Sequence, residues 1–116
     1  MWYLSGKTFL YKEKPDSIEK ISVFDGTTGR SFTVSGREEI EYIVGNIKSN
    51  RMKRDGISLG YKGYSFDLDF IDKDGKTVSS FIINSENTIR DDPFFYRCDG
   101  TLCFDYLAAL EKEALS

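Results

Sequence analysis

The sequence predicts one α+β domain in which two helices cover one face of an antiparallel β-sheet. Three observations predict this class. Alternating apolar and polar residues recur in short runs joined by tight turns, as in a sheet built of hairpins. Apolar residues at helical spacing mark residues 37–49 and 103–114 as helices. The order lacks repeated strand–helix–strand crossovers, so we expect about five to seven antiparallel strands.

Length and composition place residues 1–116 in a single domain. A chain of this size buries roughly 65% of the surface that its unfolded form exposes, which is enough for one core. Its 40% hydrophobic and 30% charged residues are typical of a folded, water-soluble protein. The net charge of -3 opposes a general nucleic-acid or membrane-surface binder, because both need a concentrated positive field.

Short alternating runs mark the strands. We expect strand conformation within residues 2–4, 8–12, 18–24, 30–34, 57–59, 64–71 and 77–83. An Asp-Gly turn within residues 25–29 makes a hairpin of the third and fourth runs, and the turn at residues 72–76 joins the last two. In the run 64–71, phenylalanine and leucine alternate with serine and aspartate, which is typical of a half-buried strand.

The central helix is the most regular local pattern. Ser35 and Glu38 have the S-x-x-E spacing of a capping box, in which the serine side chain caps the first turn. Asn50 is expected to end this helix. In the C-terminal helix, acidic residues and lysine fall on the side away from the leucines. The expected buried residues of the two helices are Ile40, Ile43, Val44, Ile47, Leu107 and Leu110.

Residues 84–97 have the most unusual composition. They set amides, hydroxyls and two arginines beside three consecutive aromatic residues, the mixture that binding surfaces favour. Arginine provides fork-shaped donors, and tyrosine is a rigid amphipathic ring. We therefore predict an interaction surface made by Tyr61, Tyr64, Asn84, Asn87, Arg90, Tyr96 and Arg97. The alternative places the aromatic residues in the core, beside a polar loop that satisfies its own backbone.

Two other functions compete with a binding module. Residues 51–64 interleave lysine and arginine with Tyr61 and Tyr64, which suits a nucleic-acid adaptor that stacks bases over a basic track. Asp67 and Asp69 share a strand face and could act as paired catalytic carboxylates. Their face is the solvent side, where carboxylates keep ordinary pKa values, and the chain has no histidine, which removes most hydrolase templates. The sequence therefore favours a non-enzymatic binding or protein-interaction module for an unidentified protein or small ligand.

No cofactor or metal site is predicted. Asp72 and Asp74 open a segment similar to a calcium loop, but the acid required at its twelfth position is Ile83 here, so a hairpin turn is preferred. Cys98 and Cys103 flank an Asp-Gly turn. We favour two free thiols, with a disulfide that closes the turn as the alternative and metal binding third.

The sequence predicts no membrane-spanning helix, because no run approaches the ~18 uncharged apolar residues required. Residues 1–7 lack the basic and apolar regions of a signal peptide, so we expect a cytoplasmic protein. If a leader had been removed from the chain, the location would be extracytoplasmic.

Residues 18–110 resemble an uncharacterised domain of Firmicutes, met in short hypothetical proteins and in predicted lipoproteins. The segments that carry the resemblance are residues 57–64, 70–76, 83–90 and 93–97. The resemblance implies family membership and carries over no activity or catalytic residue. In members outside the cytoplasm, it implies a signal peptide and a lipobox cysteine ahead of the domain.

Overall fold

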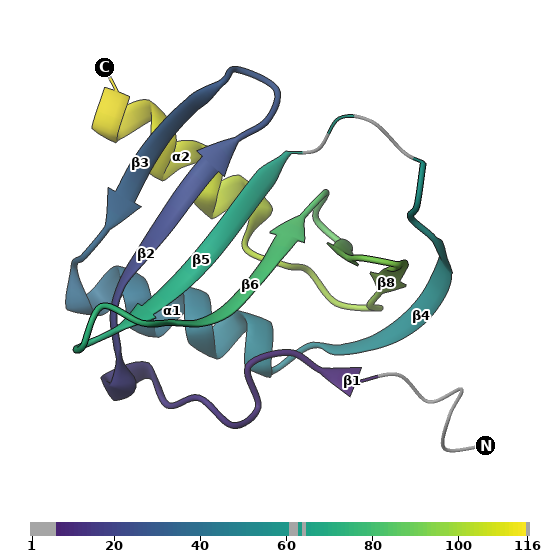
Figure 1. Ribbon diagram of the computed structural model, residues 1–116, viewed down its shortest axis with the longest axis horizontal. Helices are drawn as coiled ribbons and strands as arrows, with labels where there is room; N and C mark the ends of the chain where they lie inside the picture. Colours follow the sequence, from purple (N-terminus) through teal and green to yellow (C-terminus); the bar gives the residue numbers. More distant parts are fainter. Residues whose placement is uncertain (1–6, 61–62, 64, 116) are drawn as a thin grey trace.

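The computed structural model describes residues 7–60, 63 and 65–115 of the chain. Within these ranges the chain forms one eight-stranded antiparallel sheet, two α-helices and a 3₁₀ turn at Pro15–Ser17 (Figure 1). The spatial order of the strands is β1-β4-β8-β7-β6-β5-β2-β3. The strands are β1 (Lys7–Thr8), β2 (Ile18–Asp25), β3 (Arg30–Val34), β4 (Arg51–Ile57), β5 (Phe66–Asp72), β6 (Thr77–Ile83), β7 (Thr88–Asp91) and β8 (Phe94–Arg97).

The α+β class and the antiparallel sheet are confirmed, but the prediction of five to seven strands was wrong. Among the described residues there are eight, because pairing makes strands of three segments without a predicted strand, residues 51–56, 88–91 and 94–97. β4 buries only Met52, so it has no apolar alternation, and its pairing with β8 holds it extended. β7 lies in the segment expected to be a polar loop. Of the run 8–12, only Thr8 belongs to a strand.

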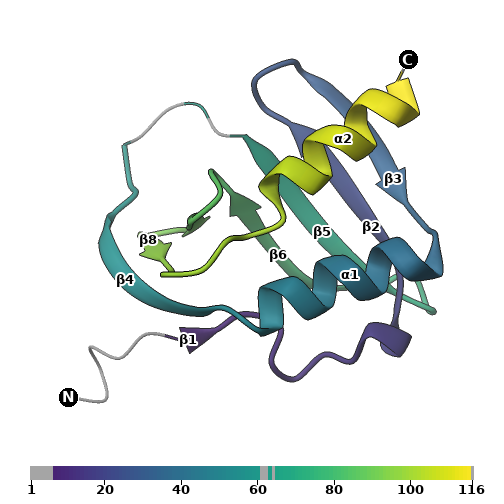
Figure 2. The same ribbon diagram turned by 180° about the vertical axis from the view of Figure 1, so that it is seen from behind.

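Both helices lie on one face of the sheet, as predicted (Figure 2). They are α1 (Arg37–Lys48) and α2 (Phe104–Leu115). The predicted apolar stripe of α1 is fully buried, as is Leu107 of α2, whereas Leu110 is only partly buried. The rings of Tyr42 and Tyr106 lie 4.2 Å apart between centroids and join the two helices. In the described part of the chain, no helix has the length and apolar character needed to cross a bilayer.

The start of α1 differs from the predicted capping box by one residue. Gly36, not Ser35, is the N-cap, and no side chain caps it through a hydrogen bond. The carboxylate of Glu39 lies over Gly36, where a Cβ atom would overlap it. A carboxylate in the first turn is favourable beside the free N–H groups of the helix. The helix therefore begins where it was predicted to begin, but the carboxylate that lies over its N-terminus is that of Glu39 instead of Glu38.

The core fills the space between the sheet and the helices. Strand side chains alternate as predicted, with Phe66, Leu68 and Phe70 of β5 buried toward the helices and the aspartates between them directed away. Phe81 and Ile83 continue this inner face on β6, opposite Leu68 and Phe66. Beyond β6 the sheet curves into a half-barrel through the short strands β7 and β8 and the longer, curved β4 (Figure 1).

Candidate functional site

The loop before β7 uses its polar groups internally. The side-chain oxygen of Asn87 accepts hydrogen bonds from the hydroxyls of Ser85 and Thr88 at 3.0 and 2.9 Å. The backbone oxygen of Asn87 accepts from the N–H of Cys98. Asn84 is part-buried, and its backbone oxygen accepts from Ser65. The loop satisfies its own backbone, as in the alternative interpretation.

Arg90 is held in a network that ties β7 to the loop after β4. Its Nε donates to Asp92 at 2.9 Å, and the hydroxyl of the fully buried Ser58 donates to the same carboxylate oxygen. These two hydrogen bonds hold the pKa of Asp92 below its ordinary value, and the one from Ser58 has the larger effect. The Arg90 side chain is only 12% exposed, so most of it is inside the fold.

The remaining predicted interaction residues are divided. Tyr96 is 7% exposed and packs edge-on against Phe9, with 5.2 Å between ring centroids. Arg97 is exposed and pairs with Asp55 at 3.1 Å. Tyr61 and Tyr64 lie outside the described residues. An interaction role for these seven residues stays a prediction, but Tyr96 has little surface to offer a partner.

The carboxylates considered for catalysis lie on the sheet face opposite the helices. Asp67 stands between Phe24 and Ile82 on the neighbouring strands, and desolvation there raises its pKa, with a further contribution from Asp69. The expectation of an ordinary pKa was therefore wrong for Asp67. Asp69 accepts a hydrogen bond from the hydroxyl of Ser80. An enzymatic role stays a prediction for this pair.

The basic segment 51–64 is partly engaged within the chain. Lys53 is exposed, whereas the guanidinium of Arg54 lies 3.9 Å from the ring centroid of Phe94. Within residues 51–60, Asp55 adds a negative charge that pairs with Arg97. A nucleic-acid adaptor role stays a prediction.

Cys98 and Cys103 are free and buried. Burial raises the pKa of both thiols, that of Cys103 to about 12. Among the described residues, no three potential His, Cys, Asp or Glu ligands come together for a metal ion.

The turn at 72–76 is a hairpin turn as predicted and joins the antiparallel strands β5 and β6. A side-chain oxygen of Asp72 accepts hydrogen bonds from the backbone N–H groups of Asp74 and Lys76.

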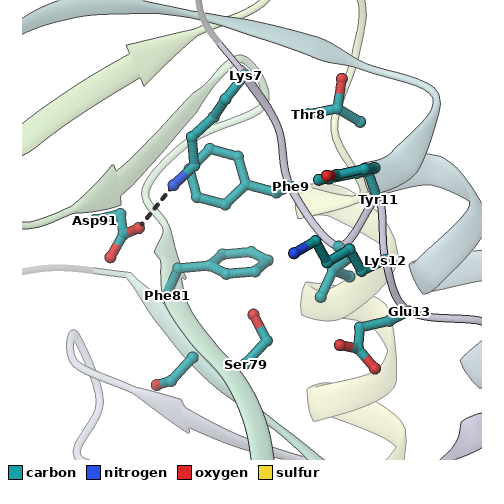
Figure 3. Close-up of a pocket in the computed structure, with 11 residues that line it drawn as sticks. Lys7, Thr8, Phe9, Tyr11, Lys12, Glu13, Ser79, Phe81 and Asp91 are labelled. Carbon is teal, nitrogen blue, oxygen red and sulfur yellow. Dashed lines mark hydrogen bonds and ion pairs between the residues drawn. The ribbon is translucent and has the colours of Figure 1, made fainter.

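A hollow borders β6, which is paired along only part of one side in the described part of the chain. β7 pairs with β6 at Ile82 and Ile83 and ends at Asp91, where the chain turns into β8. The first five residues of β6, 77–81, therefore have β5 as their one strand neighbour in the described part of the chain. Residues 7–13 face this edge across a groove of about 600 Å³ (Figure 3).

The groove between residues 7–13 and 79–81, here called the β6 groove, has an aromatic wall. Phe9 and Phe81 are buried with ring centroids 4.9 Å apart. Tyr11 stands at the rim and is 66% exposed. Ser79 occupies an inward-facing position of β6, opposite Phe70, where Phe81 and Ile83 are large. Its small side chain leaves the hollow open.

The segment that forms the other wall is held in a strained turn. Leu10 has a φ of 65°, in the left-handed region that a branched side chain rarely adopts. Its side chain is buried in the core, and its backbone oxygen accepts the N–H of Glu13 at 2.9 Å. Lys48 of α1 donates to the backbone oxygen of Glu13. The turn thus buries Leu10 while its neighbour Tyr11 is exposed.

Charges mark the two ends of the β6 groove. At one end, Lys7 pairs with Asp91 at 3.5 Å, and its ammonium lies 4.5 Å from the ring centroid of Phe9. At the other end, Lys12 is exposed and its ammonium lies 5.9 Å from the ring centroid of Tyr11. Among the described residues, Lys12 forms no ion pair, so its ammonium is a positive charge at this end, which the carboxylate of Glu13 also lines (Figure 3).

The sequence contains one signal for this site. Position 79 of the run 77–83 holds a serine, whereas the other positions that share its face toward the C-terminal end hold Phe81 and Ile83. Comparison with protein-family models, curated proteins and solved structures found no match for this chain. The resemblance to the Firmicutes domain stays a prediction.

Proposed function

We propose that this protein is a non-enzymatic binding module that takes its ligand into the β6 groove. The observation that carries the proposal is a 600 Å³ hollow with aromatic walls and polar groups at its rim. Binding sites for small ligands and short segments commonly have volumes of roughly 300–1,000 Å³ and this mixture of surfaces. The strained turn at Leu10 adds support, because backbone strain concentrates at ligand-binding sites.

Exposed tyrosine is well suited to this role. Tyr11 offers a large amphipathic ring with few rotatable bonds, so fixing it against a ligand costs little side-chain entropy. In segment 84–97, by contrast, Tyr96 and Arg90 are mostly enclosed by the fold. The binding class predicted from the sequence is therefore retained, with a different surface as its site.

The test uses Ser79→Phe, which fills the hollow, and the control Ser31→Phe, which makes the same change at an exposed position of the edge strand β3. Two probe sets are used, a phage-displayed library of random seven-residue peptides and a set of small aromatic acids and amines. We expect probes that bind the parent and Ser31→Phe and shift the NMR amide signals of residues 7–13 and 79–81. Binding to Ser79→Phe should be lost. If no probe distinguished the parent from Ser79→Phe, the proposed function would be wrong.

A further inference from the structure

We infer that the β6 groove recognises an extended peptide, which adds to β6 as an extra strand. The inference rests on the proposed function and names the class of ligand. In a sheet, successive backbone groups of a strand point alternately toward its two neighbours. For residues 77–81 one of these neighbours is missing among the described residues. Their N–H and C=O groups on that side face the groove and are the groups that an added strand would bind.

The wall opposite β6 leaves this edge open. Within residues 7–13, the one backbone hydrogen bond outside strand pairing joins Glu13 to Leu10, and none reaches β6. β1 pairs instead with β4, through Lys7 and Thr8. Counting only the strands of the described ranges, the groove thus lies where the half-barrel has no strand, between the edge of β6 and the irregular segment that follows β1. A compact small molecule could fill the hollow, but it would leave most of the row of backbone groups unbound.

The dimensions set the length of the ligand. Five residues at about 3.3 Å each span at most roughly 16 Å, and a register shift at Val78 interrupts the regular edge, which matches a peptide segment of about three to five residues. Side chains of the added strand would alternate in direction, as those of β6 do. Those on the inner side would enter the hollow left by Ser79, beside Phe9 and Phe81. We therefore expect one bulky apolar residue at the centre of the bound segment.

The charges add a second element of specificity. Lys7 is neutralised by Asp91, whereas Lys12 has no ion pair among the described residues. Glu13 lines the same end, so the complementary group is an acidic side chain of the peptide that contacts Lys12 and lies away from the Glu13 carboxylate. The expected partner is therefore an extended segment of another protein, with an apolar residue at its centre and an acidic residue toward one end.

The first experiment takes peptides enriched from the random library on the parent protein and methylates their backbone nitrogens one at a time. An N-methyl group removes the hydrogen-bond donor and leaves the side chain unchanged. We expect affinity to fall about tenfold or more at every second residue of the bound segment and to change less than about threefold at the residues between. Amide exchange within residues 77–81 should slow in the complex.

The outcomes separate this inference from the proposed function. Alternating losses on N-methylation support strand addition. Peptides that bind the parent but not Ser79→Phe, and that tolerate every N-methylation, would overturn strand addition and leave the proposed function standing. Binding of small aromatic probes alone would have the same meaning. If no probe of either kind distinguished the parent from Ser79→Phe, both would fall.

The second experiment tests the predicted acidic residue. In Lys12→Glu, we expect enriched peptides with an acidic end to bind about tenfold more weakly at low salt, and less so at high salt, because salt screens exposed charges. Exchanging the acidic residue of the peptide for lysine should restore binding to this variant. Lys20→Glu, at an exposed position of β2, provides the matched control. Equal binding to Lys12→Glu and the parent would overturn the charge assignment.

Discussion

Segments 7–13 and 84–97 each present a tyrosine, but the fold uses the two residues in opposite ways. Tyr96 is 7% exposed and packs on Phe9, whereas Tyr11 is 66% exposed at the rim of the β6 groove. Polar side chains of segment 84–97 such as Arg90 and Asp92 are bonded to one another, whereas the groove borders residues 77–81, which have no strand neighbour on that side among the described residues. A residue type that is typical of binding surfaces is therefore available to a ligand only where the fold leaves it exposed, as it does Tyr11.

The largest expected effect is on stability at Tyr96. Tyr96→Ala should lower the free energy of unfolding by about 3–5 kcal/mol, because it leaves a cavity beside Phe9 in the core. Tyr96→Phe keeps the ring and should cost less than about 1.5 kcal/mol. Urea unfolding of the three proteins measures both differences. Equal midpoints for Tyr96→Ala and the parent would place this tyrosine in the same class as Tyr11.

The two arginines of segment 84–97 provide a matched pair. Arg90→Ala should cost about 1–3 kcal/mol, because it removes the charged donor to Asp92 from a mostly enclosed position. Arg97→Ala should cost only about 0–1 kcal/mol, because its ion pair with Asp55 is exposed. Thermal unfolding of both variants tests the difference. A larger loss for Arg97→Ala would contradict the distinction between an internal network and a surface pair.

The groove tyrosine should behave in the reverse way. Tyr11→Ala should change the free energy of unfolding by no more than about 0.5 kcal/mol, as exposed substitutions usually do. Its affinity for groove-binding peptides should fall about tenfold, or about 1.4 kcal/mol, because tyrosine is a frequent contributor to binding energy. Unfolding and calorimetric titration together check this. If Tyr11→Ala bound peptides as tightly as the parent, the ring of Tyr11 would not be part of the binding site.

The smallest expected effect is a pH dependence at Asp92. Its pKa in the fold is below the ordinary value of 3.8, so the ionised form is favoured by folding. The stabilisation is complete above pH 3.8 and is lost as the pH falls through the lowered value. The melting temperature of Asp92→Asn should therefore lie below that of the parent near pH 6 and approach it below pH 3.8. A constant difference across this range would show that the hydrogen bonds do not depend on the charge.

The regular elements could be predicted because their signals are local. The spacing of Ile40, Ile43, Val44 and Ile47 identifies α1, and the alternation around Leu68 identifies β5. β4 and β7 gave no such signal. β4 has one buried residue and β7 buries only Ile89, so their extended conformation depends on partners distant in sequence. The shift of the α1 cap to Gly36 depends likewise on where the Glu39 side chain folds.

The candidate site could not be predicted, because it depends on the short pairing of β7 with β6, which leaves residues 77–81 without a second strand neighbour among the described residues. Residues 7–13 and 79–81 are far apart in the chain, and nothing in either segment shows that β7 will end at Asp91. Composition pointed to Arg90 and Tyr96, which are suitable residue types, but it could not show that Asp92, Ser58 and Phe9 would engage them. The alternative, in which the aromatic residues of this segment lie in the core, describes Tyr96 correctly.

The two buried thiols allow local opening of the fold to be measured. Cys98 directly follows β8 and Cys103 directly precedes α2, and raised pKa values keep both thiols protonated and unreactive near pH 7. A thiol reagent can modify either one only after the surrounding structure has moved aside, so the labelling rate measures how often that happens. Cys98→Ser and Cys103→Ser each leave one thiol. Labelling of the remaining Cys98 measures the release of β8, and labelling of the remaining Cys103 measures the release of α2, without any engineered probe site.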